Sequence, residues 1–99
     1  MFKGYIMNEK QKEILRITQE ECAEVIQAIS KIFRFGVDEI YQDQTNRQRL
    51  AGELGDLQCM ITLLKQYDVV KDTEIFTAEL NKRNRLTQWS DIFKEDKLQ

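Results

Sequence analysis

The sequence predicts an all-α protein, a helical bundle of about three main helices whose core is completed by oligomerisation. The 99 residues include no proline and only four glycines, which favours long helices joined by few turns. Apolar residues also recur at spacings of three and four in three separate segments, as they do on one face of a helix. Three such helices leave an apolar face open, and a chain this short buries a modest share of its surface. We therefore expect a homodimer or homotetramer.

The first helix is expected from about Asn8 to Phe33. Asn8 is a suitable N-cap, and Gly36 marks the end because glycine favours the backbone conformation that often follows a helix. An apolar stripe at helical spacing needs a second helix to cover it. The stripe of this first helix comprises Ile14, Thr18, Cys22, Val25, Ile29 and Ile32.

The second helix is expected from about Arg47 to Gln66, after a loop with a short turn around Ile40 and Tyr41. Thr45 or Asn46 is a suitable N-cap, since both side chains can accept a hydrogen bond from the first turn. The helix carries the regular spacing of a buried face. Its apolar stripe comprises Leu50, Leu54, Leu57, Ile61 and Leu64.

The third helix is expected from about Glu74 to Gln88, with Thr73 as its N-cap. The short polar tail that follows either frays or docks through Trp89 and Phe93. No internal repeat, linker or low-complexity stretch divides the chain, so we expect a single domain over residues 1–99. The apolar positions of this helix are Ile75, Ala78, Leu80 and Leu86.

Charge and hydropathy exclude several classes of protein. The formal net charge of -2 argues against a general nucleic-acid surface, which is normally basic. No stretch is long and apolar enough to cross a membrane, and the first residues, MFKGYIMNEK, lack the apolar core of a signal peptide. These features predict a cytoplasmic protein that binds neither nucleic acid nor membrane.

The cysteine and histidine content limits the available chemistry. Cys22 and Cys59 both fall inside predicted helices, and in a reducing compartment we expect them to be small buried hydrophobic residues. The chain has no histidine, which excludes Ser-His and Cys-His nucleophile pairs and histidine-containing zinc sites. Any hydrolytic chemistry must therefore use carboxylates, a metal ion or both.

Acidic residues interrupt the apolar faces of the first two predicted helices. On a helical wheel of about 100° per residue, Glu21 falls inside the first apolar arc, Glu24 lies at its edge and Glu20 lies outside. On the second helix, Glu53 and Asp56 are both bracketed by apolar residues. Each pair has i,i+3 spacing and points to the interior side of its helix. If the two helices pack antiparallel through these faces, four carboxylates converge.

Four ionised carboxylates in a partly buried pocket need a compensating charge, because burial and mutual repulsion otherwise raise their pKa values. A divalent cation supplies that charge. Ligation by oxygen alone suits Mg²⁺ or Mn²⁺, and the absence of histidine and of a cysteine cluster disfavours Zn²⁺. Because Mg²⁺ often completes its shell with substrate phosphates, the pattern indicates a metal site for a phosphorylated ligand. The alternative from the pattern alone is a solvated acidic face.

These motifs resemble those of the MazG-like all-α nucleoside triphosphate pyrophosphohydrolases, whose signature is E-E-x-x-E followed after a variable gap by E-x-x-D. Here the signature reads EECAE from Glu20 and ELGD from Glu53, and the resemblance extends over most of the chain. It implies Mg²⁺- or Mn²⁺-dependent hydrolysis of (deoxy)nucleoside triphosphates to the monophosphate and pyrophosphate, and hence nucleotide-pool sanitation. It also implies that Glu20 orients or deprotonates the attacking water. The implied metal ligands are Glu21, Glu24, Glu53 and Asp56.

The resemblance further implies basic residues on a later helix that meet the triphosphate. Lys82 and Arg85 share a face at i,i+3 spacing, with Asn81 as a weaker candidate, and the alternative is an ordinary solvated basic face. Lys31 and Arg34, by contrast, are expected to interact with the C-terminal dipole of the first helix.

Three aromatic residues, Trp89, Phe35 and Tyr41, could stack on a nucleobase, although core or interface positions are favoured for each. Two alternative functions remain open from the sequence. One is a narrower enzyme of the same helical superfamily, such as a dUTPase or dCTPase. The other is a non-catalytic helical module that uses the acidic residues as a docking patch for a basic partner.

Overall fold

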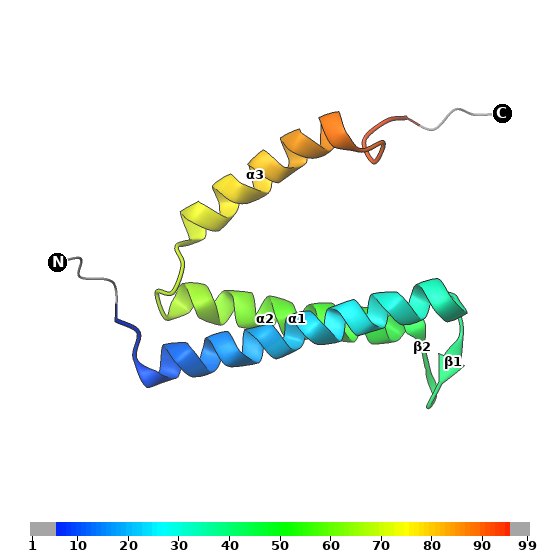
Figure 1. Ribbon diagram of the computed structural model, residues 1–99, viewed down its shortest axis with the longest axis horizontal. Coiled ribbons are helices and arrows are strands. Elements are labelled where there is room, and N and C mark those ends of the chain that lie inside the picture. Colours follow the sequence, from blue (N-terminus) through cyan, green and yellow to red (C-terminus); the bar gives the residue numbers. More distant parts are fainter. Residues whose placement is uncertain (1–5, 96–99) are drawn as a thin grey trace. The chain divides into compact units, whose positions relative to one another are not determined.

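The computed structural model describes residues 6–95, which contain three α-helices and one short β-hairpin (Figure 1). The all-α class is thereby confirmed. The chain divides between Val69 and Val70 into two compact units, of which the first holds α1, the hairpin and α2, and the second holds α3. The elements are α1 (Glu9–Phe35), β1 (Ile40–Tyr41), β2 (Gln44–Thr45), α2 (Asn46–Gln66) and α3 (Asp72–Trp89).

The ends of α1 follow the sequence signals. The Asn8 side chain accepts a hydrogen bond from the backbone N–H of Gln11 at 2.8 Å, and the Gln11 side chain accepts one from the backbone N–H of Asn8 at 2.9 Å. This reciprocal capping box satisfies two backbone donors at the start of the helix. At the other end Gly36 has a φ of 94°, which residues with a side chain rarely adopt. The predicted N-cap at Asn8 and the predicted stop at Gly36 are confirmed, and the helix continues two residues beyond Phe33, to Phe35.

The connection between α1 and α2 is a β-hairpin, where the sequence predicted a loop with a short turn. Ile40 pairs with Thr45 and Tyr41 with Gln44, in antiparallel register. Gln42 and Asp43, which form the two-residue turn, have positive φ values of 52° and 67°. This geometry matches the right-handed twist of paired strands. Asn-Gly and Asp-Gly are the usual residues in such a turn, so Gln-Asp carries little sequence signal for it.

The start of α2 agrees with the sequence and the start of α3 does not. Thr45 caps α2, since its hydroxyl accepts a hydrogen bond from the backbone N–H of Gln48 at 3.1 Å. The prediction that Thr73 caps the third helix is wrong, because α3 begins at Asp72 and Lys71 is the N-cap. The Glu74 carboxylate accepts a hydrogen bond from the Lys71 backbone N–H at 2.8 Å, so the third helical position supplies the cap.

Helices α1 and α2 lie side by side and antiparallel, and a row of shielded residues runs along each (Figure 1). The rows alternate spacings of three and four, as expected where two helices pack along their length. Each row contains a glutamate among apolar residues, so the packing of the helices also positions acidic groups. On α1 the row is Gln11, Ile14, Thr18, Glu21, Val25, Ala28 and Ile32. On α2 it is Asn46, Leu50, Glu53, Leu57, Met60 and Leu64.

Two buried amides hold the ends of this helical pair together. Gln11 is 4% exposed, and its Nε2 donates to the Tyr67 carbonyl oxygen just beyond α2 at 2.8 Å. Asn46 is 3% exposed, and its Nδ2 donates to the Gly36 carbonyl oxygen just beyond α1 at 2.9 Å. Buried polar groups of this kind are costly when left unpaired, so both side chains set how the two helices meet.

Replacing Gln11 with Ala is expected to lower the free energy of unfolding by about 1–3 kcal/mol, because the Tyr67 carbonyl and the Asn8 N–H lose their partners. Chemical denaturation monitored by circular dichroism measures this loss. Glu13→Ala is the matched control on the same helix, since Glu13 is exposed, and its effect should stay within about 0.5 kcal/mol. Equal stability of the two variants would refute the structural role given to Gln11.

Several hydrophobic residues lie outside the shielded rows. The prediction that Cys22 and Cys59 are buried is wrong, because both are exposed. Cys22 follows the row residue Glu21, and Cys59 precedes the row residue Met60. One residue corresponds to about 100° around a helix, so both cysteines point away from the α1–α2 contact. Ile29 and Leu54, two members of the predicted stripes, are also 39% and 46% exposed.

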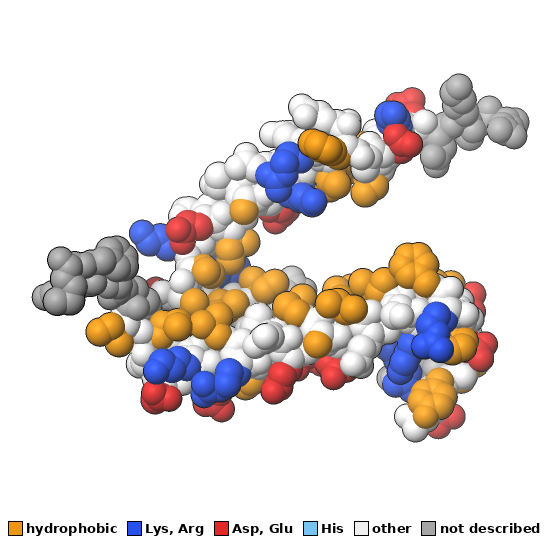
Figure 2. All heavy atoms as spheres, viewed as in Figure 1, with side chains coloured by type: hydrophobic (Ala, Val, Ile, Leu, Met, Phe, Trp, Pro, Cys, Tyr) orange, Lys and Arg blue, Asp and Glu red, His pale blue; other side chains and the backbone are white. Residues whose placement is uncertain are grey.

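The larger apolar surface gathers in one place. Figure 2 shows hydrophobic side chains along one long edge of the α1–α2 pair and charged side chains, both acidic and basic, along the opposite edge. Phe35 and Tyr41 are 54% and 57% exposed on the first unit and Trp89 is 81% exposed on α3, so none of the three is buried in the core of its own unit. The interface position that was also expected for them stays a prediction. No helix in the described part of the chain is long and apolar enough to span a membrane.

Candidate metal centre

The α1–α2 pair brings three acidic residues together. Glu21 from α1 and Glu53 and Asp56 from α2 each offer a carboxylate oxygen, and these oxygens all lie within 4.8 Å of one another. Glu21 and Glu53 occupy row positions and are half-buried, whereas Asp56 is exposed. Because the glutamates belong to the rows that pack the two helices, the convergence follows from the helical packing itself.

The electrostatics of this cluster centre on Glu21. Partial burial raises the pKa of Glu21 above its ordinary value, and the repulsion of neighbouring carboxylates raises it further. Those neighbours, in order of decreasing effect, are Asp56, Glu53, Glu24 and Glu20. A cation held among the carboxylates would remove this repulsion, so the electrostatics of the cluster suit a positively charged ligand.

The chemistry of the donor set fits a hard divalent cation. Glu21, Glu53 and Asp56 supply oxygen ligands only, which suit Mg²⁺, Mn²⁺ or Ca²⁺. Their oxygens are close enough to share one ion, since two ligands on opposite sides of a Mg²⁺ at about 2.1 Å are about 4.2 Å apart. Three protein ligands also leave coordination positions open for water or a phosphate oxygen.

The other two acidic residues of the predicted set lie beside this cluster. Glu24 is exposed and is not one of the three clustered carboxylates; it lines a small polar hollow with Glu53 and Arg49. Glu20 is exposed, which agrees with its place outside the apolar arc, and its charge still contributes to the raised pKa of Glu21. The structure therefore brings together three of the four predicted ligands and places the fourth one helical turn away.

Two basic residues near these carboxylates were not predicted from the sequence. Lys31 and Arg49 line the same polar hollow as Glu24 and Glu53. The Lys31 side chain therefore lies near the carboxylates as well as near the C-terminal end of α1. Arg49 donates from Nη2 to the Tyr41 carbonyl oxygen, and its Nε is buried with no hydrogen-bond partner in the described part of the chain. The i,i+4 spacing of Arg49 and Glu53 is the sequence signal that could have revealed this position.

The predicted phosphate-binding residues belong to α3, in the second compact unit. Lys82 and Arg85 line an open hollow of about 420 Å³ together with Leu86 and Trp89. Asn81 is exposed and does not line this hollow. Lys82 and Arg85 thus present two cationic groups beside an exposed aromatic ring.

Together these observations define a class: an all-α protein with an oxygen-only candidate cation site between two antiparallel helices. The chain belongs to the MazG nucleotide pyrophosphohydrolase domain family, whose model matches residues 9–87. Comparisons with curated proteins and with solved structures found no match. The clustered residues Glu21, Glu53 and Asp56 all fall within the matched segment.

Proposed function

We propose that this protein hydrolyses (deoxy)nucleoside triphosphates to the monophosphate and pyrophosphate in a Mg²⁺- or Mn²⁺-dependent reaction. The observation that carries the proposal is the convergence of Glu21, Glu53 and Asp56, within 4.8 Å, in a chain of the MazG family. Removal of excess or unwanted nucleotides is the corresponding cellular role.

In this proposal Glu21, Glu53 and Asp56 hold the metal, and Glu24 completes the ligand set from the next turn of α1. The metal, when bound, neutralises phosphate charge and lowers the pKa of a coordinated water. Through that cation the carboxylates would fix the position of the phosphates relative to the attacking water, and such positioning is a main contribution that a protein makes to phosphoryl chemistry.

Glu20 is proposed to orient the attacking water and accept its proton. Glu20 is exposed on α1 beside the cluster, so its carboxylate is free to face a water rather than the α1–α2 contact. The water oxygen forms a bond to the α-phosphorus as the bond to the bridging oxygen breaks, and the electron pair leaves with pyrophosphate. No covalent enzyme intermediate is needed.

Lys82 and Arg85, with Asn81 as a weaker third member, are proposed to bind phosphate oxygens of the substrate. Cationic groups of this kind stabilise the negative charge that develops on the leaving pyrophosphate. The shared face of Lys82 and Arg85 on α3 supports this assignment, since both can approach one anion.

A homodimer or homotetramer is proposed as the working assembly. Large hydrophobic side chains lie exposed on the first unit, including Ile26, Phe33 and Leu54, and contiguous exposed apolar surface commonly marks a protein interface. A second copy of the chain would cover this surface and enlarge the core, in which Ile14, Ala28 and Met60 are the buried hydrophobic residues among residues 6–95.

A coupled phosphate assay with added inorganic pyrophosphatase tests the proposed reaction over canonical and damaged nucleotides. With Mg²⁺ present, at least one triphosphate should release pyrophosphate, and EDTA should abolish the release because the carboxylates alone supply no electrophile. A preference confined to dUTP or dCTP would indicate the narrower enzyme. No release from any triphosphate with either Mg²⁺ or Mn²⁺ would refute the proposed activity.

A further inference from the structure

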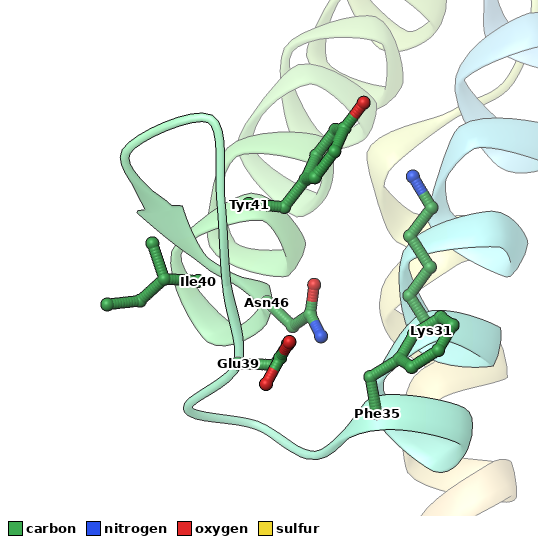
Figure 3. A pocket seen from close by; sticks show the side chains of 6 residues that line it. All are labelled: Lys31, Phe35, Glu39, Ile40, Tyr41 and Asn46. Atoms are coloured by element: carbon green, nitrogen blue, oxygen red, sulfur yellow. The ribbon is translucent and has the colours of Figure 1, made fainter.

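A cavity of about 300 Å³ lies between the C-terminal end of α1 and the β-hairpin, within the first compact unit (Figure 3). Its volume is at the lower end of the range for small-molecule sites. None of its lining residues belongs to the carboxylate cluster or to the predicted phosphate-binding set. The lining residues are Lys31, Phe35, Glu39, Ile40, Tyr41 and Asn46.

This cavity shares two lining residues with a hollow in the carboxylate region. The polar hollow of about 90 Å³ that is lined by Glu24 and Glu53 is also lined by Lys31 and Asn46, which both face the larger cavity. Arg49 lies in the polar hollow and offers the buried, unpartnered Nε described above. From the carboxylate cluster to the larger cavity, the lining side chains are therefore first acidic, then basic and then largely apolar.

That order of surfaces corresponds to the parts of a nucleotide. A metal held by carboxylates binds phosphate, basic side chains bind phosphate or sugar oxygens, and an apolar cavity with aromatic walls accepts a flat heterocycle. We propose that the cavity between Phe35 and Tyr41 binds the nucleobase of the substrate, and that Lys31 and Arg49 bind oxygens between the base and the metal. This assignment rests on the proposed function.

The aromatic side chains of the cavity suit a base. Phe35 and Tyr41 are more than half exposed, so a ring that stacks on them would shield apolar surface from water. Two basic side chains contact Tyr41, because the Arg49 guanidinium lies 5.2 Å and the Lys31 amino group 5.9 Å from its ring centroid. A ring positioned in this way loses little conformational freedom when a base stacks on it.

Asn46 supplies a polar group of defined direction. Because its Nδ2 donates to the Gly36 carbonyl oxygen at 2.9 Å, its Oδ1 faces the other way. Figure 3 shows this oxygen pointing into the space between Tyr41 and Lys31. The amide therefore presents an acceptor to a ligand, and the side chain is rigid because it is 3% exposed.

The acceptors of the cavity favour particular bases. The Asn46 oxygen and the Glu39 carboxylate both accept hydrogen bonds, so a base that presents an amino group satisfies them. Adenine, cytosine and guanine carry an exocyclic amino group with two N–H donors, one for each acceptor, whereas uracil and thymine offer a single ring N3–H between two carbonyl oxygens. The cavity is therefore assigned to amino-bearing nucleobases.

Replacing Tyr41 with Ala is expected to raise the KM for the preferred nucleoside triphosphate about tenfold, because one base–aromatic stack contributes about 5–150-fold in affinity. The kcat should change by less than about threefold, since the metal ligands are intact. Tyr41→Phe should restore the wild-type KM because it keeps the ring. Phe76→Ala is the control, since Phe76 is 60% exposed on α3 and lies outside the cavity lining.

A base-free competitor separates the cavity from the phosphate site. Inorganic triphosphate should inhibit wild type and Tyr41→Ala with the same inhibition constant, because it has no base to place in the cavity. Phe35→Ala, which alters the α1 wall rather than the hairpin, should repeat the KM effect and so excludes hairpin unfolding as its cause. An unchanged KM in both Tyr41→Ala and Phe35→Ala would overturn the base assignment while leaving the hydrolase function intact.

Base selectivity tests the acceptor assignment. Wild type should prefer dATP, dCTP or dGTP to dUTP and dTTP in kcat/KM, and Glu39→Gln should narrow that ratio about fivefold or more because the amide can donate to a carbonyl. A wild-type preference for dUTP or dTTP would overturn the assignment to amino-bearing bases. If no triphosphate is hydrolysed, equilibrium dialysis with nucleoside monophosphates tests the base assignment independently of catalysis. Weaker binding by Tyr41→Ala than by wild type supports the assignment, and equal binding refutes it.

Discussion

Glu53→Gln and Asp56→Asn are each expected to lower kcat/KM by more than about 100-fold while the protein stays folded. Both carboxylates belong to the group whose oxygens lie within 4.8 Å of one another, and each substitution removes a charged carboxylate of the proposed metal site without a change of shape. Even groups that only support a metal ligand cost about 10–100-fold when they are removed, so the loss of a ligand should cost more. Pyrophosphate release at saturating Mg²⁺ measures the effect.

Two further variants give this experiment its controls. Glu13→Gln removes one exposed carboxylate from α1 away from the cluster and should retain wild-type turnover. Glu24→Gln should also cause a large loss if Glu24 completes the ligand set, although its carboxylate is not clustered with the other three. Wild-type turnover in either Glu53→Gln or Asp56→Asn would show that the metal centre has been assigned to the wrong residues.

Glu21→Gln is expected to raise the melting temperature of the metal-free protein at pH 7 and to remove most of its stabilisation by Mg²⁺. The pKa of Glu21 is raised from its ordinary value of 4.5, so the folded state holds this proton more tightly than the unfolded state does. The stability of the metal-free protein therefore falls as the pH rises from 4.5 through the raised pKa. A neutral amide removes that destabilising charge.

Mg²⁺ should reverse the same destabilisation in the wild-type protein. At ten times its Kd, a ligand that binds only the folded state adds about 1.4 kcal/mol, which corresponds to a rise of about 6–11 °C for a domain of this size. The shift should shrink as the pH is lowered towards the pKa of Glu21, because protons compete with the metal for the carboxylate. Scanning calorimetry with Mg²⁺ or EDTA, between pH 5 and 8, measures both effects.

Two results would contradict these predictions for Glu21 and Mg²⁺. If neither Mg²⁺ nor Mn²⁺ at millimolar concentration shifts the wild-type transition, the acidic cluster is a solvated face and not a metal centre. If Glu21→Gln destabilises the metal-free protein at pH 7, the carboxylate contributes favourable contacts that outweigh its repulsion from Asp56 and Glu53.

Those parts of the fold that depend on residues close in sequence could be predicted. The caps at Asn8 and Thr45 join side chains to backbone groups three residues away, and Gly36 ends α1 through its own backbone preference. The sequence failed where the local signal was ambiguous. Thr73 is a good capping residue, but the Glu74 carboxylate caps the backbone of Lys71 and starts α3 earlier.

The candidate site could also be predicted in part from the sequence. A helical wheel placed Glu21 and Glu53 on the faces where the helices meet, because helical spacing alone sets the direction of a side chain. The wheel put Glu24 at the edge of its apolar arc and Asp56 inside the other arc, but it contains no information on how α1 is offset along α2. All four acidic residues were therefore predicted to converge, whereas Asp56 joins the cluster and Glu24 does not. It also placed Cys22 in the apolar stripe, although Cys22 is exposed.

The sequence by itself determined the helical class, the helix ends at Asn8 and Gly36, and the acidic motifs, because these depend on the spacing of nearby residues. Only the tertiary structure decided which carboxylates share a site and which residues line the cavity beside the hairpin. Lys31 and Asn46 are separated by the end of α1 and the hairpin, and they line one cavity because Gln42 and Asp43 turn the chain back. Such a contact depends on the path of the whole connection, which no local spacing specifies.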